Sequence, residues 1–164
     1  MNAQSLELPR PKILQFMIQH RFGSIENGFY DLFGMDYATI RFDFHYGLTE
    51  RLSFGVGRSS LDKIYDIFVK TKLLRQSSGT RSFPVSVLLY SDIGIDTKRK
   101  SENDPAVKDE YLNRLLYVNQ LIIGRKFNRS LSLEILPTLI HRNLVPTNQD
   151  DHDLASVGIA RRYK

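Results

Sequence analysis

The sequence predicts an all-β fold, an antiparallel up-and-down barrel of about eight strands, and three observations predict it. Apolar and polar residues alternate with a period of two along most of the chain. The alternating segments are about 8 to 13 residues long, near the length that a tilted strand needs to cross a bilayer. Tight polar turns and longer loops follow one another between these segments.

The first two segments, residues 12–22 and 38–48, alternate most clearly. In the first segment one face holds Leu14, Phe16 and Ile18. In the second, one face holds Ile40, Phe42, Phe44 and Tyr46, and the opposite face holds Arg41, Asp43, His45 and Gly47. Because successive side chains of a strand point to opposite sides, each segment is expected to form a strand with one apolar and one polar face.

Six further segments complete the expected sheet: residues 52–59, 65–74, 84–95, 112–125, 130–142 and 154–164. The phase of residues 112–125 is ambiguous, and on its outward, apolar face we place Leu115, Tyr117, Leu121 and Ile123. Tight turns are expected at one end of the sheet, at 48–50 and 126–129, and long loops at the other, at 23–37, 96–110 and 143–153. The longer connection 76–82 falls on the tight-turn end, so this asymmetry is imperfect.

The composition limits the size, the chemistry and the partners that are expected of this protein. A chain of 164 residues is one ordinary domain, 1–164, in which residues 1–10 are expected to be extended and flexible. The absence of cysteine excludes disulfides, thiolate zinc sites and a cysteine nucleophile. A net charge of +5 favours anionic partners in general. Lysines and arginines are spread along the whole chain, so no nucleic-acid partner is expected.

Alternation alone does not say which face meets water. A soluble barrel hides its apolar face inside, whereas a membrane barrel turns that face towards lipid. Charges of both signs occur in mid-strand on the polar face, as at Arg41 and Asp43. Tyrosines lie towards strand ends, where an aromatic girdle would sit, at Tyr46, Tyr65 and Tyr163. These features favour a transmembrane barrel with a hydrated, salt-bridged interior.

The polar face defines the residues that are expected to line the lumen. The set that we single out is Arg21, Arg41, Asp43, His45, Asp66, Lys70, Lys72, Arg114, Glu134, Arg142 and Arg162. With Asp92 and Lys164 added, bases outnumber acids on this face. An open lumen would therefore favour anions, but a closed barrel of about eight strands has room only for side chains. A channel thus requires a larger barrel.

Several blocks of the chain are similar to a known family. They are LQFMIQHRFG, FGMDYATIRFDFHYGLTERLSFGVGRSS, YDIFVKTKLLRQ, QLIIGRKFNRSLSLEILPTLIHRNLVPT and SVGIARRYK. From about Leu8 to Lys164 the chain resembles a Bacteroidota-type outer-membrane β-barrel family of unknown function. The resemblance implies a secretion signal before this segment and further strands after it, so that the chain is a fragment of a longer barrel. It implies no catalytic or ligand-binding residues.

No catalytic residue, metal or cofactor is predicted. No G-x-S-x-G elbow accompanies the histidines, which we interpret as rim or network residues: His20, His45, His141 and His152. Residues 148–153 are rich in oxygen ligands but lack the spacing of an EF-hand loop. Gly55 and Gly57 begin a dinucleotide motif that lacks its third glycine.

One expected outer loop is unusually apolar. Residues 28–34 read GFYDLFG, and Phe29, Tyr30 and Phe33 are the candidates for contact with a partner. The same loop is also suited to packing on the rim or to folding inward as a plug.

Together these features predict an outer-membrane β-barrel, surrounded by lipid, with a passive, porin-like or structural role and a lean towards small anionic solutes. One alternative is an accessory barrel subunit that docks an envelope protein complex through its outer loops. Another is a soluble lipocalin-like barrel that binds a ligand.

Overall fold

A computed structural model of the chain describes residues 4–80, 82–98, 111–145 and 149–163. These residues form one eight-stranded sheet in which the strands follow one another in chain order. The strands are β1 (Leu14–Arg21), β2 (Thr39–Gly47), β3 (Leu52–Ser59), β4 (Ile64–Leu74), β5 (Ser86–Asp96), β6 (Leu115–Lys126), β7 (Leu131–Arg142) and β8 (Asp153–Tyr163). Each neighbouring pair is antiparallel, so the predicted all-β, up-and-down architecture is confirmed.

Four short 3₁₀ helices accompany the strands in the described ranges. They are η1 (Gly28–Asp31), η2 (Met35–Tyr37), η3 (Leu61–Lys63) and η4 (Tyr111–Arg114). No helix among these residues is long and apolar enough to cross a membrane. The predicted polar loop 96–110 lies largely outside the described residues, as do residues 146–148 of the next loop and Lys164.

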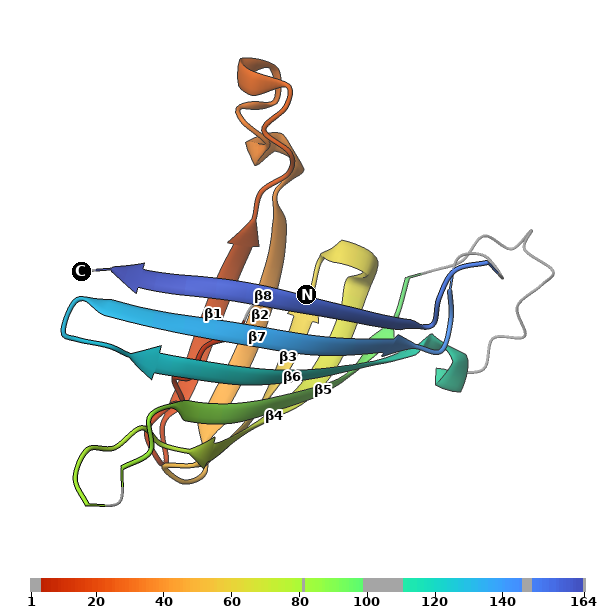
Figure 1. Cartoon of the computed structure of the whole chain (residues 1–164). Helices are drawn as coiled ribbons and strands as arrows, with labels where there is room; N and C mark the ends of the chain where they lie inside the picture. The colour runs from red at the N-terminus through yellow and green to blue at the C-terminus, as the bar shows by residue number, and fades with distance from the viewer. Residues whose placement is uncertain (1–3, 81, 99–110, 146–148, 164) are drawn as a thin grey trace.

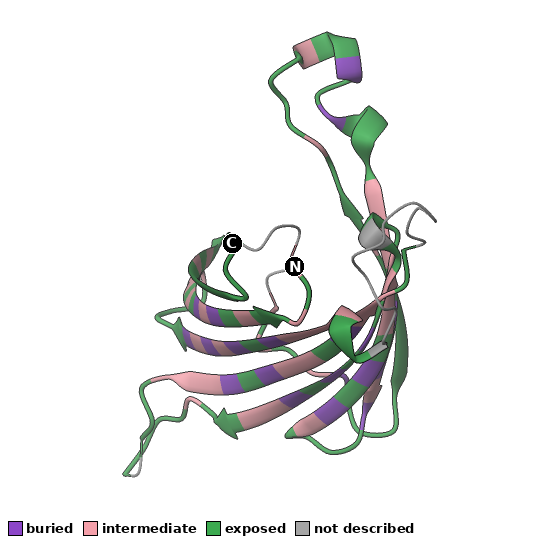
Figure 2. Cartoon of the chain, turned by 90° about the vertical axis from the view of Figure 1, so that its right-hand side faces the viewer, coloured by how far each residue is buried: buried purple, intermediate pink, exposed green. Residues whose placement is uncertain are grey.

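The sheet curls into a half-barrel. In Figure 1 strands β7 and β8 cross in front of β1 and β2, and Figure 2 shows the trough that the curved sheet encloses. Strand β1 pairs with β2 and strand β8 with β7, and within the described part of the chain neither edge has a second partner. The structure therefore leaves one side of the barrel wall open.

The two tight turns that join β2 to β3 and β6 to β7 have the same kind of side-chain cap. Thr49 Oγ1 accepts hydrogen bonds from the backbone N–H groups of Arg51 and Leu52, at 3.1 and 3.0 Å. Asn128 Oδ1 accepts the equivalent bonds at 2.8 and 2.7 Å. A side-chain acceptor at the start of each turn satisfies donors that the sheet leaves unpaired, and so defines where the next strand begins.

Burial alternates along the strands, and the apolar face is the exposed one. Phe42 and Phe44 are 39% and 48% exposed, whereas Asp43 and His45 between and beside them are 3% and 4% exposed. The stripes of buried and exposed residues in Figure 2 follow this period. The orientation predicted from the sequence, with apolar side chains on the outside of the curve, is confirmed. It is the reverse of a lipocalin-like barrel, which would bury both phenylalanines.

The interior is not polar throughout. An apolar cluster lines the concave side of β4 to β7 and consists of Phe68, Leu88, Tyr90, Val118, Ile122 and Leu136. Leu6 and Leu8 of the N-terminal segment pack against it. The expected salt-bridged interior is therefore found on only part of the wall, because these side chains contact one another and the N-terminal segment instead of charged groups.

Candidate functional site

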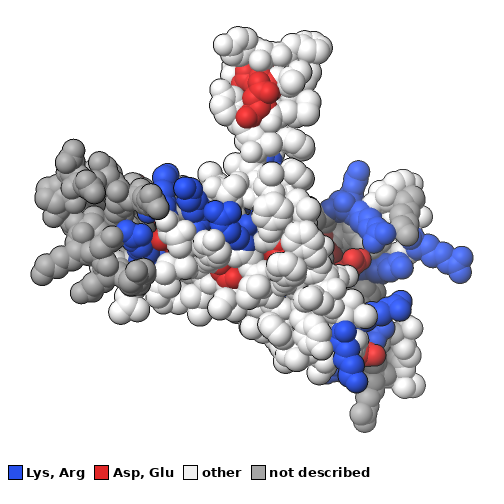
Figure 3. All heavy atoms as spheres, turned by 180° about the vertical axis from the view of Figure 1, so that it is seen from behind, with Lys and Arg blue, Asp and Glu red and all other residues white. Residues whose placement is uncertain are grey.

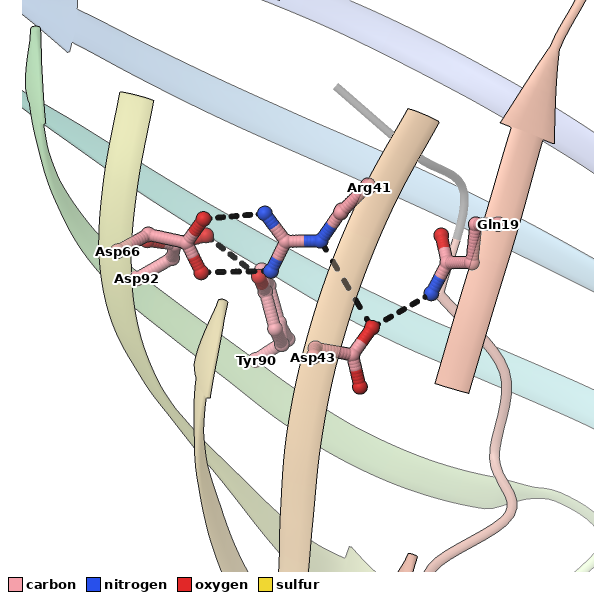
Figure 4. A network of polar contacts seen from close by, with 6 residues as sticks. All are labelled: Gln19, Arg41, Asp43, Asp66, Tyr90 and Asp92. Carbon is pink, nitrogen blue, oxygen red and sulfur yellow. Dashed lines mark hydrogen bonds and ion pairs between the residues drawn. The ribbon is translucent and has the colours of Figure 1, made fainter. Parts of the chain in front are cut away.

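The polar half of the interior contains a network of six side chains (Figure 4). They are Gln19 of β1, Arg41 and Asp43 of β2, Asp66 of β4, and Tyr90 and Asp92 of β5. Alternation places Arg41 and Asp43 on the same face of β2. The antiparallel register then sets Asp43 opposite Gly57, and Gly57 opposite Asp66, so that β2 and β4 face one another across a glycine.

Arg41 is the centre of this network. Its guanidinium group binds both carboxylate oxygens of Asp66, with 2.6 Å between Nη2 and Oδ1. Its Nε lies 3.8 Å from Oδ2 of Asp43, which also accepts a hydrogen bond from Gln19 Nε2 at 2.8 Å. Asp43 and Asp66 are only 3% and 5% exposed, so these contacts take the place of water around their charges.

Gly57 provides the space that Arg41 occupies. A Cβ atom at this position would lie 2.7 Å from Arg41 Cζ and 2.8 Å from Asp66 Oδ1. At Gly55, the next inward residue of β3, a Cβ atom would lie 2.8 Å from Cε1 of Phe68. Small inward residues on β3 thus make room for long side chains on the neighbouring strands.

Tyr90 and Asp92 extend the network to β5. The Tyr90 hydroxyl donates a hydrogen bond of 2.5 Å to Asp92 Oδ2. Asp92 Oδ1 is buried and has no hydrogen-bond partner within the described residues. Gln19 and Tyr90 were not among the expected lumen residues, although the period of two places both on the inward face.

A second buried pair joins β2 to β3. His45 Nε2 and Ser53 Oγ lie 2.7 Å apart, and the rings of His45 and Phe68 meet edge to face with centroids 5.2 Å apart. Ser53 is 0% exposed, and Lys70, its neighbour in the register, is 5% exposed. A serine and a histidine are the elements of a nucleophile and its base, and here the serine is fully buried. The pair serves to satisfy two buried polar groups.

The remaining predicted lumen residues lie towards the two ends of the strands. Arg21, Arg142 and Arg162 are exposed, whereas Lys72, Arg114 and Glu134 are half-buried. Arg21, Arg114 and Arg142 lie at the loop end of β1, β6 and β7, and Lys72 and Arg162 at the opposite end of β4 and β8. Figure 3 shows Lys and Arg side chains gathered at both ends of the sheet. The structure thus brings together Arg41, Asp43 and Asp66 but not the whole predicted set.

The other histidines lie outside this network. His141 Nδ1 and Asp153 Oδ1 are 2.7 Å apart at an exposed position, and His152 Nδ1 lies 2.7 Å from the carbonyl oxygen of Arg142. No group of three or more His, Cys, Asp or Glu residues suited to a metal ion occurs in the described part of the chain.

The connection between β1 and β2 forms a compact knob, residues 22–38, that projects beyond the sheet (Figure 1). Gly23 N–H donates to Gly34 O at 2.8 Å at its base. At its tip Asn27 Nδ2 donates to Asp31 Oδ2 at 2.7 Å, and the rings of Phe29 and Phe33 meet edge to face. These contacts give the knob a defined shape of its own.

The knob exposes the aromatic residues singled out from the sequence. Phe29 is 84%, Tyr30 89% and Phe33 46% exposed. It also carries the exposed Glu26 and Asp36 and the buried Asp31, but no lysine or arginine. Figure 3 shows this acidic patch at the end of the projection. The surface it offers is both aromatic and acidic.

The fold and its two faces define a membrane-bound β-barrel, with apolar side chains outside and charged groups buried within. The chain belongs to the family described as "Membrane bound beta barrel domain (DUF5777)", whose model matches residues 1–164. No curated protein and no solved structure matches the chain.

Proposed function

We propose that this domain is part of an outer-membrane β-barrel with a passive role, porin-like or structural. The contrast between the two faces of β2 and β4 carries the proposal. Phe44 and Ile67 face outward and are 48% and 63% exposed, whereas Asp43 and Asp66 face inward and are buried. Such an apolar exterior is stable against lipid, and spans made of strands are characteristic of outer-membrane proteins. A Bacteroidota-type origin is consistent with the resemblance noted from the sequence.

The open edges of the half-barrel support a larger barrel. Unpaired backbone N–H and C=O groups are costly in hydrocarbon, so an edge strand in a membrane requires a partner. Val157 and Ile159 on the outward face of β8 are 69% and 79% exposed. We propose that further strands continue the sheet from β1 and β8. Because β1 and β8 run antiparallel to each other, an even number of additional strands keeps every neighbouring pair antiparallel.

The placement of charge supports a lean towards small anionic solutes. The three inward aspartates of the network, Asp43, Asp66 and Asp92, lie within the strands and close to Arg41. Several further basic residues of the inward face stand at the two ends, among them Arg142 and Arg162, while Arg41 and Lys70 lie within the strands. A solute that enters such a lumen meets positive charge first, and charge at a mouth raises the local concentration of the opposite ion.

We also propose that the domain is not an enzyme. The histidine and serine that lie within hydrogen-bond distance of each other are His45 and Ser53, and Ser53 is 0% exposed. A nucleophile must reach its substrate, so this pair supports a structural role in preference to a catalytic one.

Reconstitution of the full-length protein in planar bilayers tests the porin-like role. A salt gradient across the bilayer is expected to give a reversal potential of anion selectivity. Replacing Arg142 and Lys126, one at each end of the inward face, with glutamine is expected to reduce that selectivity. The matched control is Arg161→Gln, on the outward face of β8 beside Leu133, which is expected to leave it unchanged. Cation preference would reject the anionic lean, and absence of conductance would leave the structural role.

A second candidate is an accessory subunit that docks an envelope complex. The exposure of Phe29 and Tyr30 on a shaped, projecting knob favours it. If it is correct, the native protein co-purifies with one stoichiometric partner, and Phe29→Ser with Tyr30→Ser abolishes the association, because buried aromatic anchors dominate protein interfaces. Leu112→Ser, at a 67% exposed site before β6, is the control and retains the partner. Retention of the partner by the double variant would reject docking through the knob.

A further inference from the structure

The N-terminal segment, residues 4–10, crosses the concave side of the sheet. At the end of β2 the chain is anchored by a hydrogen bond from Lys12 N–H to Gly47 O at 2.8 Å and by another from Gly47 N–H to Ile13 O at 3.0 Å. At its other end the backbone N–H of Gln4 donates to Gln120 Oε1 of β6 at 3.1 Å. The segment therefore joins the second strand to the sixth through the interior.

An apolar seat holds this segment. Leu6 and Leu8 pack against the cluster that contains Leu88, Ile122 and Leu136, which are 0%, 0% and 1% exposed. Pro9 is buried as well. Without the segment, the apolar side chains that line this part of the interior would form a surface open to water.

Polar groups in the wall also match the segment. The Gln120 amide that accepts from Gln4 donates through Nε2 to Thr138 Oγ1 at 2.8 Å, and both wall residues are 4% exposed. Nearer the end of the barrel, Glu7 Oε1 lies 3.6 Å from Arg162 Nη1 of β8. The segment thus supplies a hydrogen-bond partner for the oxygen of this buried amide.

Two glycines of the wall stand where the segment touches it. A Cβ atom at Gly47 would lie 2.7 Å from the carbonyl oxygen of Pro9. A Cβ atom at Gly124 would overlap Leu6 Cδ1. By contrast, a Cβ atom at Gly158, also on an inward face, would meet only Leu136, at an ordinary 3.5 Å or more. The wall therefore leaves room for the segment at both of these points.

We propose that residues 4–10 form an intramolecular plug that seats on the apolar inner wall and excludes water from that half of the lumen. The occupant is the chain's own N-terminal segment. The proposal rests on the barrel orientation and does not require that the barrel conducts any solute. A conducting barrel would carry the plug as a constriction.

Thiol labelling of the full-length protein in lipid vesicles tests the plug, since the chain has no cysteine of its own. Ile122→Cys places one thiol on the seat, and a membrane-impermeant maleimide reports its access to water. Adding Leu6→Ser and Leu8→Ser is expected to raise the labelling rate about tenfold or more, because loss of the apolar anchors releases the segment. Gly158→Cys, away from the segment, is the control and is expected to react at one rate in both backgrounds. Equal labelling of Ile122→Cys in both backgrounds would overturn the proposal.

A cross-link provides a second measurement that does not depend on weakening the segment. Leu6→Cys with Gly124→Cys is expected to form a disulfide on oxidation, because a Cβ atom at position 124 overlaps the Leu6 side chain. Leu6→Cys with Gly158→Cys is expected to keep both thiols free. Failure of the first pair to oxidise, in a barrel whose heat-modifiable mobility on gels shows that it is folded, refutes the seat. None of these readouts uses conductance, so a barrel without conductance leaves the plug standing.

Discussion

Replacing Arg41 with leucine is expected to destabilise the folded barrel by about 3–5 kcal/mol, because it leaves buried carboxylates without their cation. The Arg41 side chain is 17% exposed, and both of its acidic partners are nearly sealed from water. The substitution removes the bidentate contact with Asp66 and the closest positive charge to Asp43. Chemical unfolding of the full-length protein in lipid vesicles measures the change in the free energy of unfolding.

Two variants test whether the effect comes from a buried carboxylate that has lost its positively charged partner. Arg41→Met combined with Asp66→Leu removes both partners of the main pair and is expected to be more stable than Arg41→Leu alone. Arg162→Ala removes an exposed arginine whose acidic partner lies 3.6 Å away, and is expected to cost under about 1 kcal/mol. A loss of under about 1 kcal/mol for Arg41→Leu would contradict a dry network and indicate that water reaches the carboxylates.

Replacing Val56 with arginine is expected to cost about 2–4 kcal/mol in a bilayer, the range for a basic residue on the lipid face at the midplane. Val56 lies in the middle of β3, faces outward and is 46% exposed. Its neighbours in the register are Phe44 and Ile67, so no polar group is at hand for the new charge. Unfolding titrations in vesicles, with the wild-type protein alongside, measure the difference.

Position along the same strand supplies the control. Leu52 begins β3 on the same face, next to the tight turn, and Leu52→Arg is expected to cost only about 0–1 kcal/mol near the interface. On the surface of a soluble barrel neither substitution has this cost, because an exposed arginine is hydrated. Equal and small effects at both positions would therefore contradict the transmembrane orientation.

Much of the fold is predictable from the sequence because alternation is a local property. Two neighbouring residues of a strand point to opposite sides whatever the strand pairs with. The faces of Phe42 and Asp43 are therefore predictable without knowing how the strands of the sheet are paired. Residues 112–125, with their ambiguous phase, illustrate the limit. Val118 and Ile122 are apolar and face inward, so β6 is apolar on both faces and the period of two loses contrast there.

The candidate site is predictable only in part, because its contacts are distant in the chain. Arg41 and Asp66 were both assigned to the lumen, but their pairing depends on a register that runs through Gly57 and on the curvature of the sheet. Gln19 and Tyr90 join the same network from strands on either side. Side-chain type and phase identify the candidates, whereas the register decides which of them meet.

The N-terminal segment shows most clearly what the sequence predicts and what it does not. Residues 1–10 carry no period and were expected to be extended and flexible, yet Gln4 meets Gln120, 116 residues away, inside the trough. The sequence alone determined the strands, the order of the loops and turns between them, and the face that meets lipid. Each of these follows from neighbouring residues. Only the tertiary structure decided that the sheet stays open at β1 and β8, that the acids gather on Arg41, and that the apolar wall is covered by the chain itself. Those outcomes depend on which distant surfaces come into contact, and no local pattern encodes that.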